Sequence, residues 1–156
     1  MADLNSFVEN GGRALLLGAG PQLPKIFPEL IDAYRPCAGE IVSMRVPESP
    51  VFNGLDPLDL AWFELGSGVI PRACRGTYSI RRSSSAVSAL ASVVDIHGYL
   101  QSYKDFPKIS GSPLVELRIG KGTIIASEMM MIEAPLDPIA GKLLSNLLTY
   151  LSRPTV

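Results

Sequence analysis

The segment from Gly11 to Gln22 constrains the fold more than any other part of the chain. Two glycines lead into a short apolar run, Arg13–Leu17, which ends in a second glycine-rich stretch, Gly18–Gln22. This pattern is typical of a buried strand followed by a tight turn, where α/β proteins commonly present a nucleophile or bind a phosphate. The turn contains no Cys, Ser, Asp or Lys, so it predicts the scaffold of an active site without its reactive group.

The C-terminal third carries the clearest local signals. Residues 114–119 and 123–127 are predicted to be strands, joined by a glycine-rich connection suited to a hairpin. Asp137 and Pro138 are typical of a helix start, and apolar residues then recur at helical spacing as far as Leu151. The terminal helix is therefore expected to pack one apolar face against a sheet or another helix.

The remaining segments predict alternating helices and strands. Helices are expected over residues 3–10 and 24–34, the second bent or delayed by Pro28. Strands are expected over residues 41–46, within 69–80 and over 86–94, with helix as the alternative for the last segment. This order predicts one α/β domain spanning residues 1–156, with a layered sheet that includes an antiparallel piece.

Composition excludes several classes of partner. The formal net charge of −1 provides no field to attract nucleic acid or an anionic membrane. The chain starts with polar residues and has no apolar run near the ~20 residues that span a bilayer, so we expect a soluble chain without a signal peptide. Cys37 and Cys74 form no CxxC pattern and His97 is the only histidine, so we expect two thiols and no metal or other cofactor.

Four arginines gather within a short stretch, and they are Arg72, Arg75, Arg81 and Arg82. Such a cluster could bind a phosphate or a carboxylate. A solvated strand edge with surface ion pairs is the commoner explanation, and we favour it.

The glycine-rich segment resembles the central part of class I glutamine amidotransferase-like domains. In that family a helix ends in Gly-Gly, a strand follows, and a Cys-x-Gly-x-Gln turn carries the nucleophile. Gly20 and Gln22 match the turn, whereas the cysteine position is Gly18. The family's His-x-Glu pair would fall at residues 129–133, which contain no histidine, while Asn146 fits its terminal helix. The resemblance implies a flavodoxin-like three-layer sandwich with a mostly parallel sheet, and no amidotransferase activity.

A narrower resemblance concerns Pro50–Leu55, Asp59, Trp62 and the segment 120–151. These stretches are similar to the amidotransferase-like module attached to glycoside hydrolases such as β-galactosidases. That module is generally non-catalytic and lies at a domain or subunit interface. The chain is short at its N-terminus for this group, so we expect a truncated domain. Its open sheet edge should pair with a second copy or with upstream domains.

Two alternative functions remain open from the sequence. A hydrolase could use Asp95 and His97 with Glu128 as acid–base groups, although a loop histidine bonded to its neighbour is the plainer interpretation. A binding domain could hold an anion on the backbone of Gly18, Ala19, Gly20 and Gln22, or stack a carbohydrate on Trp62. For those residues, a tight turn and an anchor for a short helix are the plainer interpretations.

Overall fold

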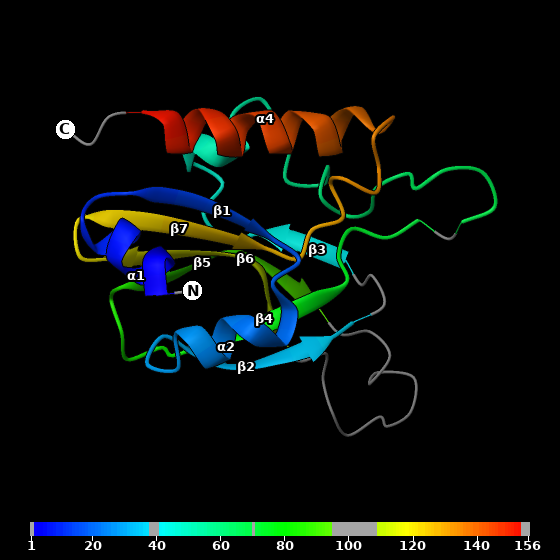
Figure 1. Ribbon diagram of the computed structural model, residues 1–156. Coiled ribbons are helices and arrows are strands. Elements are labelled where there is room, and N and C mark those ends of the chain that lie inside the picture. The colour runs from blue at the N-terminus through cyan, green and yellow to red at the C-terminus, as the bar shows by residue number, and fades with distance from the viewer. Residues whose placement is uncertain (1, 38–40, 70, 95–108, 154–156) are drawn as a thin grey trace, which may run out of the picture.

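The computed structural model describes residues 2–37, 41–69, 71–94 and 109–153. Within these ranges the chain forms a seven-stranded mixed sheet and a small number of helices (Figure 1). The strands are β1 (Arg13–Leu17), β2 (Ile31–Pro36), β3 (Ile41–Met44), β4 (Gly76–Ile80), β5 (Val87–Val94), β6 (Ile109–Ile119) and β7 (Gly122–Ser127). The α-helices are α1 (Ala2–Glu9), α2 (Leu23–Ile26) and α4 (Pro138–Ser152), and Gly20–Gln22 and Pro50–Phe52 form short 3₁₀ turns.

The sheet is mostly antiparallel, so the expected flavodoxin-like sandwich with a mostly parallel sheet is wrong. Its main path runs β1-β7-β6-β4-β2, while β5 pairs with β6 and with β3. Among the described pairings only β1 with β7 is parallel. Parallel neighbours need long crossovers, usually helical. The described stretch between β1 and β5 contains no helix longer than α2, so it supplies no helical crossover of that kind.

The helix expected over residues 24–34 is also wrong, because Pro28 stops it early. Helix α2 covers only Leu23–Ile26, and Phe27 already leaves the helical region with φ −126° and ψ 60°. A residue that precedes proline is driven out of the α conformation by contact with the proline ring. The apolar residues that follow enter strand β2, in which Ile31 is buried.

The N-terminal helix, the first strand, the hairpin and the terminal helix form as predicted. The turn between β6 and β7 uses Gly120 at φ 58°, a left-handed conformation that favours glycine. The Asp137 side chain accepts hydrogen bonds from the backbone N–H groups of Ile139 (2.8 Å) and Ala140 (3.0 Å). This cap starts α4 at Pro138.

Two apolar clusters lie on opposite faces of the sheet. Helix α4 covers one face, where Leu143 and Leu147 are fully buried in the same cluster as Ile125 of β7. Helices α1 and α2 lie on the other face, where Val8 and Leu23 are fully buried. Figure 1 shows this arrangement, with α4 above the sheet and α1 and α2 below it. Helices therefore cover both faces of the sheet around β1, β7 and β6.

Candidate functional site

The candidate site lies where the parallel strands β1 and β7 end together. Leu17 pairs with Ser127 in the last step of the ladder, and the Gly18 N–H donates to the Ser127 carbonyl at 2.8 Å. Gly18 and Gly20 have φ of 65° and 53°, so glycine suits both positions of the turn after β1. The carboxyl ends of neighbouring parallel strands are where α/β proteins commonly bind ligands.

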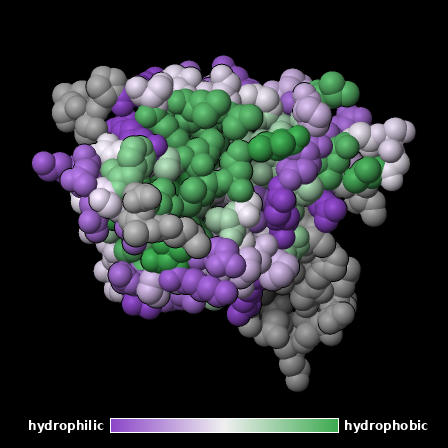
Figure 2. Space-filling view, in the orientation of Figure 1, coloured by the Kyte–Doolittle hydropathy of each residue, from purple (hydrophilic) through white to green (hydrophobic). Residues whose placement is uncertain are grey.

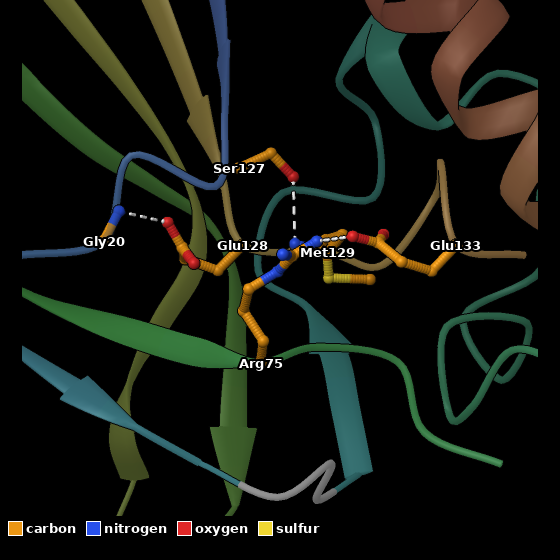
Figure 3. A network of polar contacts seen from close by, with 6 residues as sticks. All are labelled: Gly20, Arg75, Ser127, Glu128, Met129 and Glu133. Atoms are coloured by element: carbon orange, nitrogen blue, oxygen red, sulfur yellow. Dashed lines mark hydrogen bonds and ion pairs between the residues drawn. The ribbon is translucent and has the colours of Figure 1, made fainter. Parts of the chain in front are cut away.

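A buried carboxylate from the end of β7 occupies this turn. Glu128 is 1% exposed, and its Oε1 atom accepts a hydrogen bond from the Gly20 N–H at 2.8 Å (Figure 3). The same oxygen accepts a hydrogen bond from the Tyr78 hydroxyl. The second oxygen, Oε2, is buried and accepts no hydrogen bond from the described residues. The Gly20 N–H, which the sequence placed among possible anion donors, therefore already has an internal carboxylate as its acceptor.

Tyr78 is the buried donor that completes this contact. Its side chain is fully buried on β4. Burial and, next, the hydrogen bond to Glu128 raise the pKa of Tyr78 far above its usual value of 10. The ring of Tyr34 on β2 lies 5.7 Å from that of Tyr78, centroid to centroid. Burial and the Glu128 charge also raise the pKa of Tyr34. Both phenols therefore keep their protons at neutral pH and cannot act as bases.

Arg75 covers the position that would carry a nucleophile. A Cβ atom placed on Gly18 would lie 3.6 Å from Arg75 Nη1 and 3.7 Å from its Cζ. The Arg75 guanidinium forms an ion pair with Glu133, and Figure 3 shows both side chains beside Met129. The backbone of the arginine is fixed as well, because its N–H donates to the Glu128 carbonyl at 3.0 Å. A cationic side chain thus lies over the turn from outside.

The described groups at this strand end lack the arrangement that acyl transfer or hydrolysis requires. Glu128 is almost inaccessible, whereas a general base must come within hydrogen-bond reach of a substrate proton. Ser127 is fully buried, and its Oγ atom accepts a hydrogen bond from the Met129 N–H at 3.1 Å. Gly18 itself has no side chain to react.

The structure brings together some of the sequence-predicted site residues and separates others. Gly18, Gly20 and Glu128 lie together at the strand end. The Ala19 carbonyl accepts a hydrogen bond from the Gln22 N–H at 3.1 Å, and the Gln22 residue is exposed. Trp62 is 62% exposed in a loop after the Pro50–Phe52 turn, whereas Glu128 is buried. Asp95 and His97 lie outside the described residues.

Sequence reasoning missed two groups at this site. Tyr78 comes from β4 and contacts a residue 50 positions away in the chain, so no spacing rule indicates it. Cys37 and Cys74 are thiols, as expected, but the sequence did not indicate that their Sγ atoms lie 3.4 Å apart. Only the antiparallel register of β2 and β4 brings them together.

The described residues contain no group of three or more His, Cys, Asp or Glu side chains able to hold a metal ion. No helix within the same ranges is long and apolar enough to cross a membrane.

A separate open cavity of about 620 Å³ lies among β4, β5 and β6. The exposed side chains of Arg45 and Arg82 line it, together with the buried Ser92 and Ser112. No Asp or Glu appears among the described residues that line it. The cavity therefore has a mixed polar and apolar lining with two cationic side chains, and it lies beside Tyr78 rather than over the glycine turn.

Comparison with solved structures identifies the fold. The chain is similar to a ThuA-like protein from Bacteroides uniformis, with 17% identity and a TM-score of 0.59 over 96% of this chain and 62% of that one. It is also similar to a cytoplasmic protein from Salmonella typhimurium, with 15% identity and a TM-score of 0.56 over 98% of this chain and 60% of that one. The chain thus spans about six tenths of both structures. The expected relation to amidotransferase-like domains is supported at the level of fold.

A weaker likeness is to a β-galactosidase from Bacillus circulans. The identity is 11% and the TM-score 0.45, over 94% of this chain and 20% of the enzyme. At that score it adds nothing to the assignment of the fold. No family model matches the sequence, and no curated protein matches it either.

Proposed function

We propose that this chain is a non-catalytic domain of amidotransferase-like fold that associates with a second copy through the open edge of β1. The observation that carries the proposal is that one edge of β1 has no described pairing strand. One edge of β1 pairs with β7, and no described strand pairs with the other edge. All five residues of β1 remain partly exposed. Residues 14–17 are apolar, so Arg13 is the one charged residue of this strand and no proline interrupts it.

Apolar side chains flank this edge on the α4 side. Helical spacing places Leu144, Leu148 and Leu151 on one flank of α4, away from the flank that carries Tyr150. The Tyr150 hydroxyl donates to Glu116 on β6, so the leucine flank faces towards β1. Leu148 is 54% exposed.

On the α1 side, Phe7 is also 54% exposed. Figure 2 shows a continuous apolar area between α4 and α1, over the place of β1 in Figure 1. We define the β1 surface as the partly or fully exposed apolar residues of β1 and of the facing sides of α1 and α4, which are Phe7, Ala14, Leu15, Leu16, Leu17, Leu144, Leu148 and Leu151. Contiguous apolar surface of this kind marks interaction sites on proteins.

The charge pattern of β1 favours a second copy as the occupant. Two β1 strands related by a two-fold axis run antiparallel, with Leu15 near the axis and Arg13 of each copy opposite Leu17 of the other. No like charges then face each other across the strand pair. Arg13 is also held away from the edge, because its guanidinium donates to the carbonyl oxygens of Tyr150 (3.2 Å) and Arg153 (2.6 Å).

The closed strand end supports the non-catalytic part of the proposal. Glu128 occupies the backbone donor of the glycine turn, and Arg75 lies over the position of a nucleophile. The sequence resemblance at residues 50–55 and 120–151 supports a role beside a carbohydrate-active enzyme, in which the domain would pack rather than react. Carbohydrate turnover would then belong to the partner.

Sedimentation of the purified chain over the micromolar range tests the association. We expect a concentration-dependent equilibrium between monomer and dimer. In the dimer, the β1 amides should exchange their hydrogens with solvent more slowly than in the monomer. A monomer at every concentration, or a dimer that leaves those amides unprotected, would overturn the proposal.

The positively charged cavity favours a second candidate function, the binding of a small anion. Two arginines and two buried serines line it, without an acidic residue among the described lining. Arginine guanidinium groups suit phosphate and carboxylate. Calorimetric titration with inorganic phosphate tests this. We expect Arg82→Ala to abolish the binding heat and Arg81→Ala to retain it, because Arg81 forms an ion pair with Asp32 instead. Equal heats from both variants would reject the cavity as the site.

A further inference from the structure

Two thiols, Cys37 and Cys74, approach each other beside the strand end. Their Sγ atoms are 3.4 Å apart, and both residues are thiols rather than a disulfide. Cys37 directly follows β2, and Cys74 lies two residues before β4. The Cys37 N–H donates to the Arg75 carbonyl at 3.1 Å, so the antiparallel pairing of these strands continues past their ends.

We infer that Cys37 and Cys74 form a redox-active dithiol that a low-molecular-weight disulfide converts to an intramolecular disulfide. A disulfide requires its sulfur atoms about 2.05 Å apart, so the observed pair must close by roughly 1.4 Å. Rotation of the side chains about χ1 can supply much of this movement, because Sγ is the only heavy atom that it moves. The hydrogen-bonded ladder meanwhile keeps the two backbones as neighbours.

The difference in exposure between the two cysteines predicts which of them reacts first. Cys37 is half-buried, whereas Cys74 is fully buried. An external disulfide therefore reaches Cys37 first. The Cys37 thiol loses its proton, attacks one sulfur of the reagent and releases one thiolate, which leaves a mixed disulfide on the protein.

Cys74 then resolves the mixed disulfide. Its thiolate attacks Cys37 Sγ and releases the second small thiol. Two protein S–H bonds are replaced by one S–S bond, and the two electrons reduce the reagent to two thiols that take up the protons. The reaction needs no other oxidant.

The dithiol is close enough to the strand end for its oxidation to matter there. Cys74 forms a single antiparallel bridge with Met129, the residue after Glu128. Arg75, which covers Gly18, follows Cys74 directly. The disulfide would therefore tie the end of β2 to the segment that carries the arginine.

Incubation of the full chain with mixtures of glutathione and glutathione disulfide tests the inference. Samples are quenched in acid, alkylated, digested and weighed by mass spectrometry. We expect the wild-type chain to yield a peptide pair cross-linked through Cys37 and Cys74. Cys74→Ala should stop at a glutathione adduct on Cys37, and Cys37→Ala should react at least about ten-fold more slowly because its remaining thiol is buried. The wild-type result alone decides the inference, so it stands even if a variant fails to fold.

A wild-type chain that stays reduced in glutathione disulfide, or that stops at the mixed disulfide on Cys37, would overturn the inference. Cross-links only between two chains would overturn it as well. Reaction of Cys37→Ala at the wild-type rate would overturn the order of the two steps. None of these outcomes depends on whether the chain dimerises through β1.

Discussion

The C-terminal end of β1 and the free edge of the same strand differ in how the rest of the molecule contacts them. At the end, an almost fully buried glutamate accepts hydrogen bonds from the Gly20 N–H and from a fully buried tyrosine, and an arginine lies over the turn. Along the edge, five residues remain half-buried and no described strand pairs with them. The turn is thus bonded within the molecule, whereas no described strand uses the edge. This contrast is the basis of our proposal that this part of the fold associates rather than reacts.

The largest expected effect is the loss of the carboxylate that closes the strand end. Glu128→Ala leaves the Gly20 N–H and the Tyr78 hydroxyl buried without an acceptor, so the free energy of unfolding should fall by about 3 kcal/mol. Urea denaturation measures this. Glu133→Ala is the control, because its partly exposed ion pair with Arg75 should cost less than about 1 kcal/mol. Equal stability of the two variants would mean that the closed end is not a stabilised unit.

Stability should also fall at alkaline pH because of Tyr78. Its pKa is raised in the folded state, first by burial and then by the hydrogen bond to Glu128. The folded chain therefore holds this proton more tightly than the unfolded chain does. The resulting stability is complete below about pH 10 and is lost as the pH rises above it, by at most about 1.4 kcal/mol per pH unit from this group.

Tyr78→Phe should flatten this dependence in urea titrations between about pH 9 and about pH 11. Tyr150→Phe is the comparison, because burial and then the hydrogen bond to Glu116 also raise the pKa of this less buried tyrosine, so it should flatten the dependence less than Tyr78→Phe does. A slope in Tyr78→Phe as steep as in the wild type would show that the buried phenol does not control alkaline unfolding.

The open edge is expected to respond in association rather than in stability. Leu148→Lys places a charge on the β1 surface and should weaken the dimer by about ten-fold, since the partly exposed leucine has apolar area left to bury there. Leu58→Lys is the matched control, because Leu58 is 81% exposed and lies outside the β1 surface. Sedimentation of both variants measures the difference. If Leu148→Lys dimerises as tightly as Leu58→Lys, another surface must hold the dimer.

The smallest expected effect is that of adding a methyl group at Gly18, where the cost should come from backbone strain rather than from crowding. Gly18→Ala should lower the free energy of unfolding by about 1 kcal/mol, because its φ of 65° disfavours any side chain. The added Cβ meets Arg75 only at ordinary contact distance. Gly141→Ala in α4 is the control and should be stabilising, since nothing lies near its Cβ position and alanine favours helix. Thermal unfolding of both variants checks the opposite signs.

Local signals in the sequence predicted the elements around β1 well. The boundaries of β1, the turn at Gly120 and the Asp137 cap all depend on residues within a few positions of one another. The helix expected over residues 24–34 ends at Ile26, because Pro28 forces Phe27 out of the helical conformation despite the apolar spacing that favours a helix.

Features that depend on strand register could not be predicted. The antiparallel order of the sheet, the contact of Tyr78 with Glu128 and the approach of Cys37 to Cys74 all join residues tens of positions apart. A strand's own sequence shows which of its faces is buried, but not which strand lies beside it. The glycine turn was thus recognised from the sequence, while the groups that fill it were not.

The pairing of β1 with β7 has a consequence for biosynthesis. Residues 13–17 pair with residues 123–127, so β1 leaves the ribosome well before the strand that pairs with it has been synthesised. Until then its leucines have no neighbouring strand, and contacts of such long sequence separation form slowly. The nascent chain therefore exposes an unpaired apolar strand until β7 has been synthesised, and such a segment is prone to aggregation during folding.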